Sequence, residues 1–389
     1  MTLRSDLARL PAEAWALFLA TLINRTGTMV LPFLVLYLTR SLGFPAGTAG
    51  AMLAVYGVAS IAAAPLAGRL SDRIGARPIM LTSLLSTGLI LLLFPLAKTL
   101  VAVTLATVLF ALANELFRPA SLSVVTSLVQ PDLRKQAFSV QRLAINLGMS
   151  VGPAVGGFLA QTSFLSLFVV DGVTSLLAFA VLAFAPWRAA SGGTGRRPGH
   201  VDLNVTAGLH DRRLLFFLVA LLPAAVVFFQ HESSMALFVV QDLGLTATVY
   251  GLLHTVNTVL IVFLEVPLNS FMGRYPHRTS LVLGALLTGA GFGALVFART
   301  AFAVALTVVI WTFGEMFLLP SLAAYVADLA PEERRGEYMG LYTMAFGGAF
   351  ALGPWAGTLV LTRFGGNTLW IGAFCCGLVS ALLFSRLKG

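Results

Sequence analysis

The feature that most constrains this chain is a series of long apolar runs separated by short polar connections. A helix needs about 20 apolar residues to cross the hydrocarbon core of a bilayer, so runs of this length predict membrane-spanning helices. The composition agrees, because only 11% of the residues are charged, whereas about a quarter are charged in a typical water-soluble domain. The 389 residues contain twelve predicted spans, near 14–38, 48–69, 78–97, 100–127, 137–161, 164–186, 214–240, 248–272, 279–298, 301–327, 337–361 and 367–385.

Basic residues are distributed unevenly among the connections between these spans. Of the 25 Lys and Arg, 18 lie in the N-terminus, the even-numbered connections and the C-terminus, and four lie in the odd-numbered connections. The positive-inside rule therefore predicts a multi-pass protein of the plasma membrane (the cytoplasmic membrane of a bacterium) with both termini in the cytosol. This topology accounts for the net charge of +9 without a nucleic-acid partner.

The two halves of the chain resemble each other. "NELFRPASLSVVTSLVQPDLRKQAFS" recurs as "GEMFLLPSLAAYVADLAPEERRGEYM", which aligns Glu115 with Glu315. Between the halves, residues 187–213 are Gly-rich and basic, a composition typical of a flexible linker. The sequence thus predicts an all-α integral membrane protein with six-helix bundles at 1–186 and 214–389, related by pseudo-two-fold symmetry and joined by a cytosolic linker. Parallel repeats of six helices are an architecture of secondary transporters.

The connection after the second span, "GRLSDRIGAR", resembles the loop 2–3 signature of the major facilitator superfamily. Gly75 permits a tight turn between antiparallel helices, and Gly68 allows a neighbouring helix to approach closely. In that fold the start of the eleventh span lies nearby, and its positive end favours a carboxylate at Asp72. The resemblance therefore implies a cytosolic latch that holds the halves together, while the alternative is that the basic residues only set topology. The matching residues are Gly68, Asp72, Arg73, Gly75 and Arg77.

A second motif, "GMSVGPAVGG", is similar to the pattern that the drug–proton antiporter branch of this superfamily carries on its fifth span. Glycines at four-residue spacing leave a bare ridge against which another helix can rock, and the proline would bend the helix. Ordinary close packing of membrane helices is the alternative explanation. The antiporter arginine expected early in the fourth span is absent, and charge appears later in that span. The motif comprises Gly148, Gly152, Pro153, Gly156 and Gly157, with a partial copy at Gly353, Pro354 and Gly357.

Ionisable residues inside spans are costly and are functional candidates by default. The resemblance implies that spans 1, 4, 7 and 10 line a central cavity, and most of the charges inside spans lie on this set. The candidates are Arg25, Glu115, Arg118, Arg142, Asp171, Glu232 (beside His231), Glu265 and Glu315.

Two of these carboxylates, Glu232 and Glu315, have no basic residue three or four positions away on their own helices. Low-dielectric surroundings disfavour the charged form of a carboxylate, so both are predicted to bind and release protons. Glu115 and Arg118 share a helical face and could simply neutralise each other. Asp171 could face the cavity, or it could instead reach towards the outer membrane surface or cap a helix.

The remaining polar candidates have more modest predicted roles. Arg142 and Glu265 are predicted to lie at the same depth and to form a gate across the boundary between halves. In the competing view, Arg142 reaches the cytosolic surface and Glu265 bonds Asn269 on its own helix. His231 is predicted to assist Glu232, and His254 to be a packing residue.

The leading functional prediction is a proton-coupled exporter of amphipathic, drug-like or lipid-like molecules. An uptake symporter and a non-transporting receptor are the alternatives. An enzyme fits poorly, because the five histidines show no metal-ligand spacing and no nucleophile–base pair stands out. The chain has no phosphate-binding loop and only three lysines, so neither ATP nor another cofactor or metal is expected. The expected partners are protons, substrate and lipid, with the protein acting as a monomer.

Overall fold

A computed structural model of the chain describes residues 9–130, 133–187, 210–272, 274–331 and 334–387. The described residues are helical throughout, with no strand among them, and eleven segments are long and apolar enough to cross a membrane. The helices are α2 (Ala12–Gly27), α3 (Val30–Arg40), α4 (Ala46–Ile74), α5 (Ala76–Leu93), α6 (Leu100–Glu115), α7 (Phe117–Leu128), α8 (Arg134–Thr162), α9 (Phe164–Phe184), α10 (Arg212–Phe228), α11 (Ser234–Leu237), α12 (Ala247–Met272), α13 (His277–Gly293), α14 (Ala301–Leu329) and α15 (Arg335–Phe384).

The last helix, α15, contains a break. It runs for 50 residues, but Gly365 has φ 81° and ψ 167°, a conformation that is not helical and that favours glycine. The predicted spans 337–361 and 367–385 lie on either side of this glycine. The kink therefore separates two helices that the sequence predicts as separate spans.

Two compact units are defined by the contacts of the chain. One consists of Met1–Leu31 and Val58–Gly199, and the other of Pro32–Gly57 and His200–Gly389. We call them unit 1 and unit 2. The predicted linker lies mostly outside the described residues, and the predicted bundle boundaries stay a prediction.

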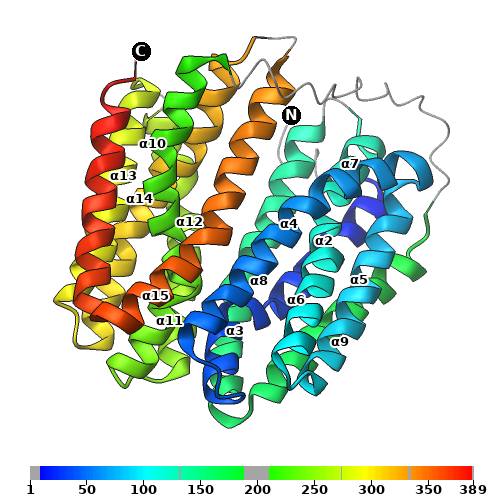
Figure 1. The fold of residues 1–389 in the computed structure, drawn as a ribbon. Coiled ribbons are helices and arrows are strands. Elements are labelled where there is room, and N and C mark those ends of the chain that lie inside the picture. Colours follow the sequence, from blue (N-terminus) through cyan, green and yellow to red (C-terminus); the bar gives the residue numbers. More distant parts are fainter. Residues whose placement is uncertain (1–8, 131–132, 188–209, 273, 332–333, 388–389) are drawn as a thin grey trace. The chain divides into compact units, whose positions relative to one another are not determined.

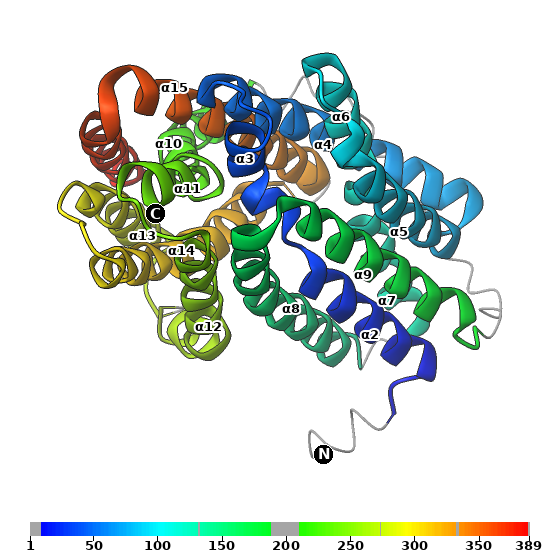
Figure 2. The same ribbon diagram turned by 90° about the horizontal axis from the view of Figure 1, so that it is seen from below.

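Unit 1 is built around α2, which packs against α8 and α9, while α5 packs against α6, α7 and α9 (Figure 2). Its core is apolar, and Leu17, Ile79 and Val125 are among the side chains buried there. Polar side chains also join its helices, since the Gln141 amide donates to the Thr21 hydroxyl over 2.8 Å. Apolar packing and hydrogen bonds thus both connect the helices of this unit.

In unit 2, α13 packs against α14 and α15, and α10 packs against α15 (Figure 1). Large rings fill the interior, including Phe217, Phe292 and Trp370, each nearly inaccessible to solvent. At the start of α10, the Asp211 carboxylate accepts from the Arg213 backbone N–H over 2.8 Å and from the Tyr338 hydroxyl over 2.7 Å. Asp211 therefore caps α10 and ties it to the first turn of α15.

The glycine ridge of α8 faces the end of α2 within unit 1. A Cβ added at Gly152 would lie 2.9 Å from the Thr28 carbonyl oxygen, and one added at Gly148 would lie 2.5 Å from Arg25 Cβ. Gly156 and Gly157 are also buried, and Pro153 lies inside the helix. Only glycine allows the two backbones to approach this closely.

A similar contact occurs in unit 2, where Gly353 and Gly357 of α15 face the end of α10. A Cβ added at Gly353 would lie 3.1 Å from the Val226 carbonyl oxygen. The Gln230 side chain donates to the Gly353 carbonyl oxygen over 2.9 Å. Each repeat thus brings its glycine motif against its own first span.

The segment 32–57 makes its contacts within unit 2 although it belongs to the first two spans. The Arg40 guanidinium donates to the Val240 carbonyl oxygen over 2.9 Å, and the Gln241 amide donates to the Thr39 hydroxyl over 3.2 Å. Further along, a Cβ added at Gly57 would lie 2.8 Å from Ala351 Cα. Hydrogen bonds and close backbone packing therefore attach this segment to unit 2.

Candidate functional site

The predicted span at residues 214–240, which begins with α10, loses its regular helical geometry midway. After α10 ends at Phe228, a 3-10 turn runs over Phe229–Glu232, and Ser233 is non-helical with φ −142° and ψ −79°. The short α11 and a π-helix over Phe238–Asp242 follow. Interrupted helices place backbone groups and side chains where a continuous helix could not, and they recur at transport sites.

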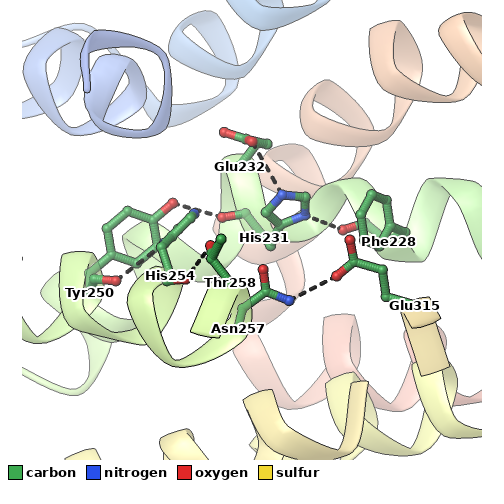
Figure 3. Close-up of polar contacts among 8 residues, drawn as sticks. All are labelled: Phe228, His231, Glu232, Tyr250, His254, Asn257, Thr258 and Glu315. Carbon is green, nitrogen blue, oxygen red and sulfur yellow. Dashed lines mark hydrogen bonds and ion pairs between the residues drawn. The ribbon is translucent and has the colours of Figure 1, made fainter. Parts of the chain in front are cut away.

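His231 lies in this irregular turn and makes polar contacts at both ring nitrogens (Figure 3). Its Nδ1 lies 2.6 Å from the Phe228 carbonyl oxygen, and its Nε2 lies 3.2 Å from the Glu232 carboxylate. The Tyr250 hydroxyl donates to the His231 carbonyl oxygen over 2.7 Å. The imidazole also stacks on Trp311, with ring centroids 5.7 Å apart. The ring is therefore held in place from several sides.

His254 of α12 faces the same point. Its Nδ1 lies 3.3 Å from the Tyr250 carbonyl oxygen, and its ring centroid lies 5.9 Å from that of His231. The His254 Nε2 and the Glu232 Oε2 are buried and have no hydrogen-bond partner among the described residues. His231, Glu232 and His254 can each offer one ligand atom, and these atoms all lie within 4.8 Å of one another. The three side chains form one cluster of metal-ligand type.

Glu315 of α14 lies beside this cluster and is held by α12. The Asn257 amide donates to the Glu315 carboxylate over 2.8 Å and to the Thr312 hydroxyl over 3.0 Å. Glu315 also interacts electrostatically with His231 and with Glu265, a residue only 8% exposed. The two predicted proton carriers, Glu232 and Glu315, are thus linked through His231.

In unit 1, Asp171 of α9 caps a helix that belongs to another span. Its carboxylate accepts from the backbone N–H groups of Met29 and Val30 over 3.2 and 3.1 Å, where α3 begins. Arg25 interacts electrostatically with this carboxylate. These two hydrogen bonds are those of a helix cap, while a role of Asp171 in coupling stays a prediction.

The loop motif after α4 is described in part. Gly75 has φ 89° and forms the turn between α4 and α5 that the sequence predicts. Arg77 donates to the carbonyl oxygens of Leu182 and Ala183 over 3.3 and 3.1 Å, at the end of α9. Arg73 is exposed. The Asp72 side chain and the surroundings of Gly68 lie outside what the structure describes, so the latch stays a prediction.

The other predicted residues are divided between the two units. Glu115 ends α6, and Arg118 lies exposed in the first turn of α7. Arg142 is exposed on α8 in unit 1, whereas Glu265 belongs to unit 2. The gate between Arg142 and Glu265 therefore also stays a prediction.

Two of the residues that build the site were not predicted from the sequence, and a third was predicted in another role. Asn257 and Tyr250 were not candidates, and His254 was expected only to pack. A signal was available, because positions 250, 254, 257 and 258 recur at helical spacing and share one face of α12. The expectation that the histidines show no metal-ligand spacing is accurate for the sequence but overlooks the cluster, whose members come from two helices.

Helices of membrane-spanning length and a partly buried polar cluster beside an interrupted span are typical of a polytopic membrane transporter. The sequence model of the Major Facilitator Superfamily matches residues 17–241 and 232–388. The chain therefore belongs to the major facilitator superfamily. This confirms the family resemblance and the multi-pass embedding in a membrane.

Several curated proteins are similar over most of the chain. The uncharacterized MFS-type transporter YqjV of Bacillus subtilis is 25% identical over 371 residues, covering 94% of this chain and 90% of its own. A Na(+), Li(+), K(+)/H(+) antiporter of Planococcus maritimus is 24% identical, covering 83% of both chains. The multidrug resistance protein MdtH of Aeromonas hydrophila is 25% identical, covering 93% of this chain and 94% of its own.

Among solved structures, the nucleoside transporter NupG in its D323A form has a TM-score of 0.80. It is 15% identical and covers 97% of this chain and all of its own. At this identity the likeness concerns the fold alone. It agrees with the all-helical architecture predicted from the apolar runs.

Proposed function

We propose that this protein is a proton-coupled secondary transporter that exports amphipathic small molecules by alternating access. The observation that carries the proposal is the linked arrangement of Glu315, His231 and Glu232 in unit 2. Asn257 holds Glu315 on one side, and His231 connects it electrostatically to Glu232 on the other. Groups of this kind inside a membrane are typical of proton relays.

The coupling follows from the chemistry of the two carboxylates. When a carboxylate in a dry site is protonated, it is neutral and no longer attracts a cationic group. When it loses its proton, it does attract one, so proton and substrate compete for the same charge. His231 can share a proton with Glu232, since its Nε2 lies 3.2 Å from the carboxylate. Protons that enter the cell down their own gradient would then displace the substrate and drive its export against the substrate gradient.

The substrate class is inferred from what lies against the cluster. Phe228 and Phe229 contact Phe346 and His231, and Trp311 stacks on the same imidazole. Aromatic faces beside a carboxylate suit a lipophilic molecule that carries a positive charge. The names of two relatives, a multidrug resistance protein and a cation/proton antiporter, support export in exchange for protons.

The finer architecture belongs to the same proposal. We infer twelve spans in two six-helix bundles, because Gly365 divides the eleventh candidate segment. The excess of basic residues in the termini and even-numbered connections supports cytosolic termini and insertion in the cell membrane. On this proposal the transporter is a monomer that needs only protons and substrate.

The proposal is tested with the purified chain in proteoliposomes that trap a pH-sensitive dye. Ethidium, an anionic lysolipid, NaCl and KCl are added in separate experiments across an imposed pH gradient. We expect ethidium to trigger proton movement that is absent from protein-free vesicles. Proton movement with Na⁺ or K⁺ alone would assign inorganic cations instead, and no movement with any solute would contradict proton coupling.

A further inference from the structure

We propose that His231, Glu232 and His254 form a binding site for a divalent transition-metal cation of the Zn²⁺ type. The three ligand atoms lie within 4.8 Å of one another. Tetrahedral ligands of one zinc ion, each about 2.0–2.2 Å from the metal, are separated by about 3.3–3.6 Å. The His231 Nε2 and the Glu232 carboxylate, 3.2 Å apart, are already close to that separation. A small rotation of the His254 side chain would bring its Nε2, the third ligand atom, to the same distance.

The hydrogen bonds of the two imidazoles select the tautomer that binds metals. Each Nδ1 faces a backbone carbonyl oxygen, that of Phe228 for His231 and that of Tyr250 for His254. A carbonyl oxygen can only accept, so each Nδ1 carries the hydrogen, and in the neutral ring each Nε2 keeps its lone pair. Metal-binding histidines usually donate their second N–H to a carbonyl or a carboxylate.

The cluster contains more acceptors than donors. With its hydrogen on Nδ1, neutral His231 turns a lone pair towards the Glu232 carboxylate, and two acceptors repel each other. The His254 Nε2 and the Glu232 Oε2 have no hydrogen-bond partner among the described residues. Buried polar atoms without partners are costly, and a bound cation or water is one way to satisfy them.

A single proton satisfies only part of this arrangement. It would convert His231 to an imidazolium that pairs with Glu232, but the His254 Nε2 would still face no donor. A divalent cation can accept a lone pair from both imidazoles and from the carboxylate at once. Two imidazoles and one carboxylate match the preference of Zn²⁺ and its neighbours, whereas Mg²⁺ and Ca²⁺ prefer oxygen ligands alone. Three protein ligands also leave a position for water, as in other open zinc sites.

The site is tested by direct binding, independently of transport. The full chain is purified in detergent, its affinity tag is removed, and Co²⁺, which replaces Zn²⁺ and absorbs visible light, is added stepwise. We expect a ligand-field band that saturates at one Co²⁺ per chain and disappears when Zn²⁺ is added. Absence of the band from the wild-type protein would overturn the proposal.

Variants assign the ligands. His254→Gln and Glu232→Gln should each weaken Co²⁺ binding by about 100-fold or more, since even residues that only support a ligand contribute about 10- to 100-fold. His210→Gln lies outside the cluster and serves as the matched control, expected to bind like the wild type. Thermal unfolding without metal shows whether each variant folds. The assignment would be contradicted if cluster variants fold and still bind Co²⁺ as tightly as the control. If His254→Gln does not fold, Glu232→Gln provides the test, because it keeps the shape of the side chain.

Discussion

Asn257 donates a hydrogen bond from its Nδ2 to the Oε2 of Glu315 over 2.8 Å, joining α12 to α14. The hydrogen-bond donor to this partly buried carboxylate is a neutral amide rather than an arginine or a lysine. An amide can hold a carboxylic acid in place whether or not the acid carries a proton, whereas a fixed positive charge would keep it ionised. The pair is therefore suited to a carboxylate that changes its protonation state during transport.

Removing the amide should impair coupling. We expect Asn257→Ala to lower proton-driven accumulation of ethidium by roughly 10- to 100-fold, because a hydrogen bond to a charged group contributes about 1.5–3 kcal/mol. The control is Thr258→Val on the same helix, since the Thr258 hydroxyl donates only to the His254 carbonyl oxygen one turn earlier. Equal accumulation by Asn257→Ala and Thr258→Val would argue against the role of Asn257.

Asp171 should contribute mainly to stability. Asp171→Ala removes the acceptor for the Met29 and Val30 N–H groups and should cost about 1–3 kcal/mol of unfolding free energy. Asp171→Asn keeps an acceptor oxygen, so it should cost less and retain proton-driven transport. Thermal unfolding in detergent and transport in proteoliposomes measure both effects. A stable Asp171→Asn protein that has lost its coupling would instead make Asp171 a proton carrier.

The glycine ridge should tolerate no side chain where it meets α2. Gly152→Ala places a Cβ about as close to the Thr28 carbonyl oxygen as a hydrogen bond would be, so α8 must move away. Overpacking of this kind costs about 1–3 kcal/mol. Gly340→Ala is the control, because nothing lies within 4 Å of a Cβ added there. If both variants unfold at the same temperature, the close contact has no energetic importance.

The bond from Arg40 to Val240 should restrain the segment that joins unit 2. Arg40→Gln removes a charge-assisted hydrogen bond that contributes about 1.5–3 kcal/mol. We expect faster hydrogen–deuterium exchange in the last turn of α3 and in Phe238–Asp242. Arg299→Gln is the control, since Arg299 donates to the neighbouring Ala298 carbonyl oxygen. Unchanged exchange in Arg40→Gln would mean that Gly57 and its neighbours hold the segment without the arginine.

The fold was largely readable from the sequence, because each span must bury its own backbone polar groups and therefore appears as a long apolar run. Gly75 could likewise be assigned to a turn, since only glycine adopts its conformation readily. The break at Ser233 was not predicted, because residues 229–240 contain no proline or glycine, although the polar stretch QHESS at 230–234 interrupts the apolar run there.

Only the acidic residues of the candidate site and the histidine beside one of them could be predicted from the sequence. Glu232 and Glu315 stand out as acids in apolar spans, whereas their partners are Asn257, Tyr250 and His254, ordinary polar residues of α12. The helical spacing of these three residues shows that they share one face of α12, but only packing between helices determines that this face meets Glu232 and Glu315. The hydrogen bonds of Asp171 could not be predicted from side chains at all, because its partners are the backbone N–H groups of Met29 and Val30 in another span.

The measurement that tests the account most directly is the uphill accumulation of ethidium by Glu315→Gln in proteoliposomes with an imposed pH gradient. Asp328→Asn, on the same helix but 72% exposed in its side chain, is the matched control and should behave like the wild type. Because an amide cannot carry a proton, we expect Glu315→Gln to exchange ethidium downhill but not to concentrate it. If Glu315→Gln concentrates ethidium at the rate of the control, the proton is carried elsewhere and the central claim is wrong.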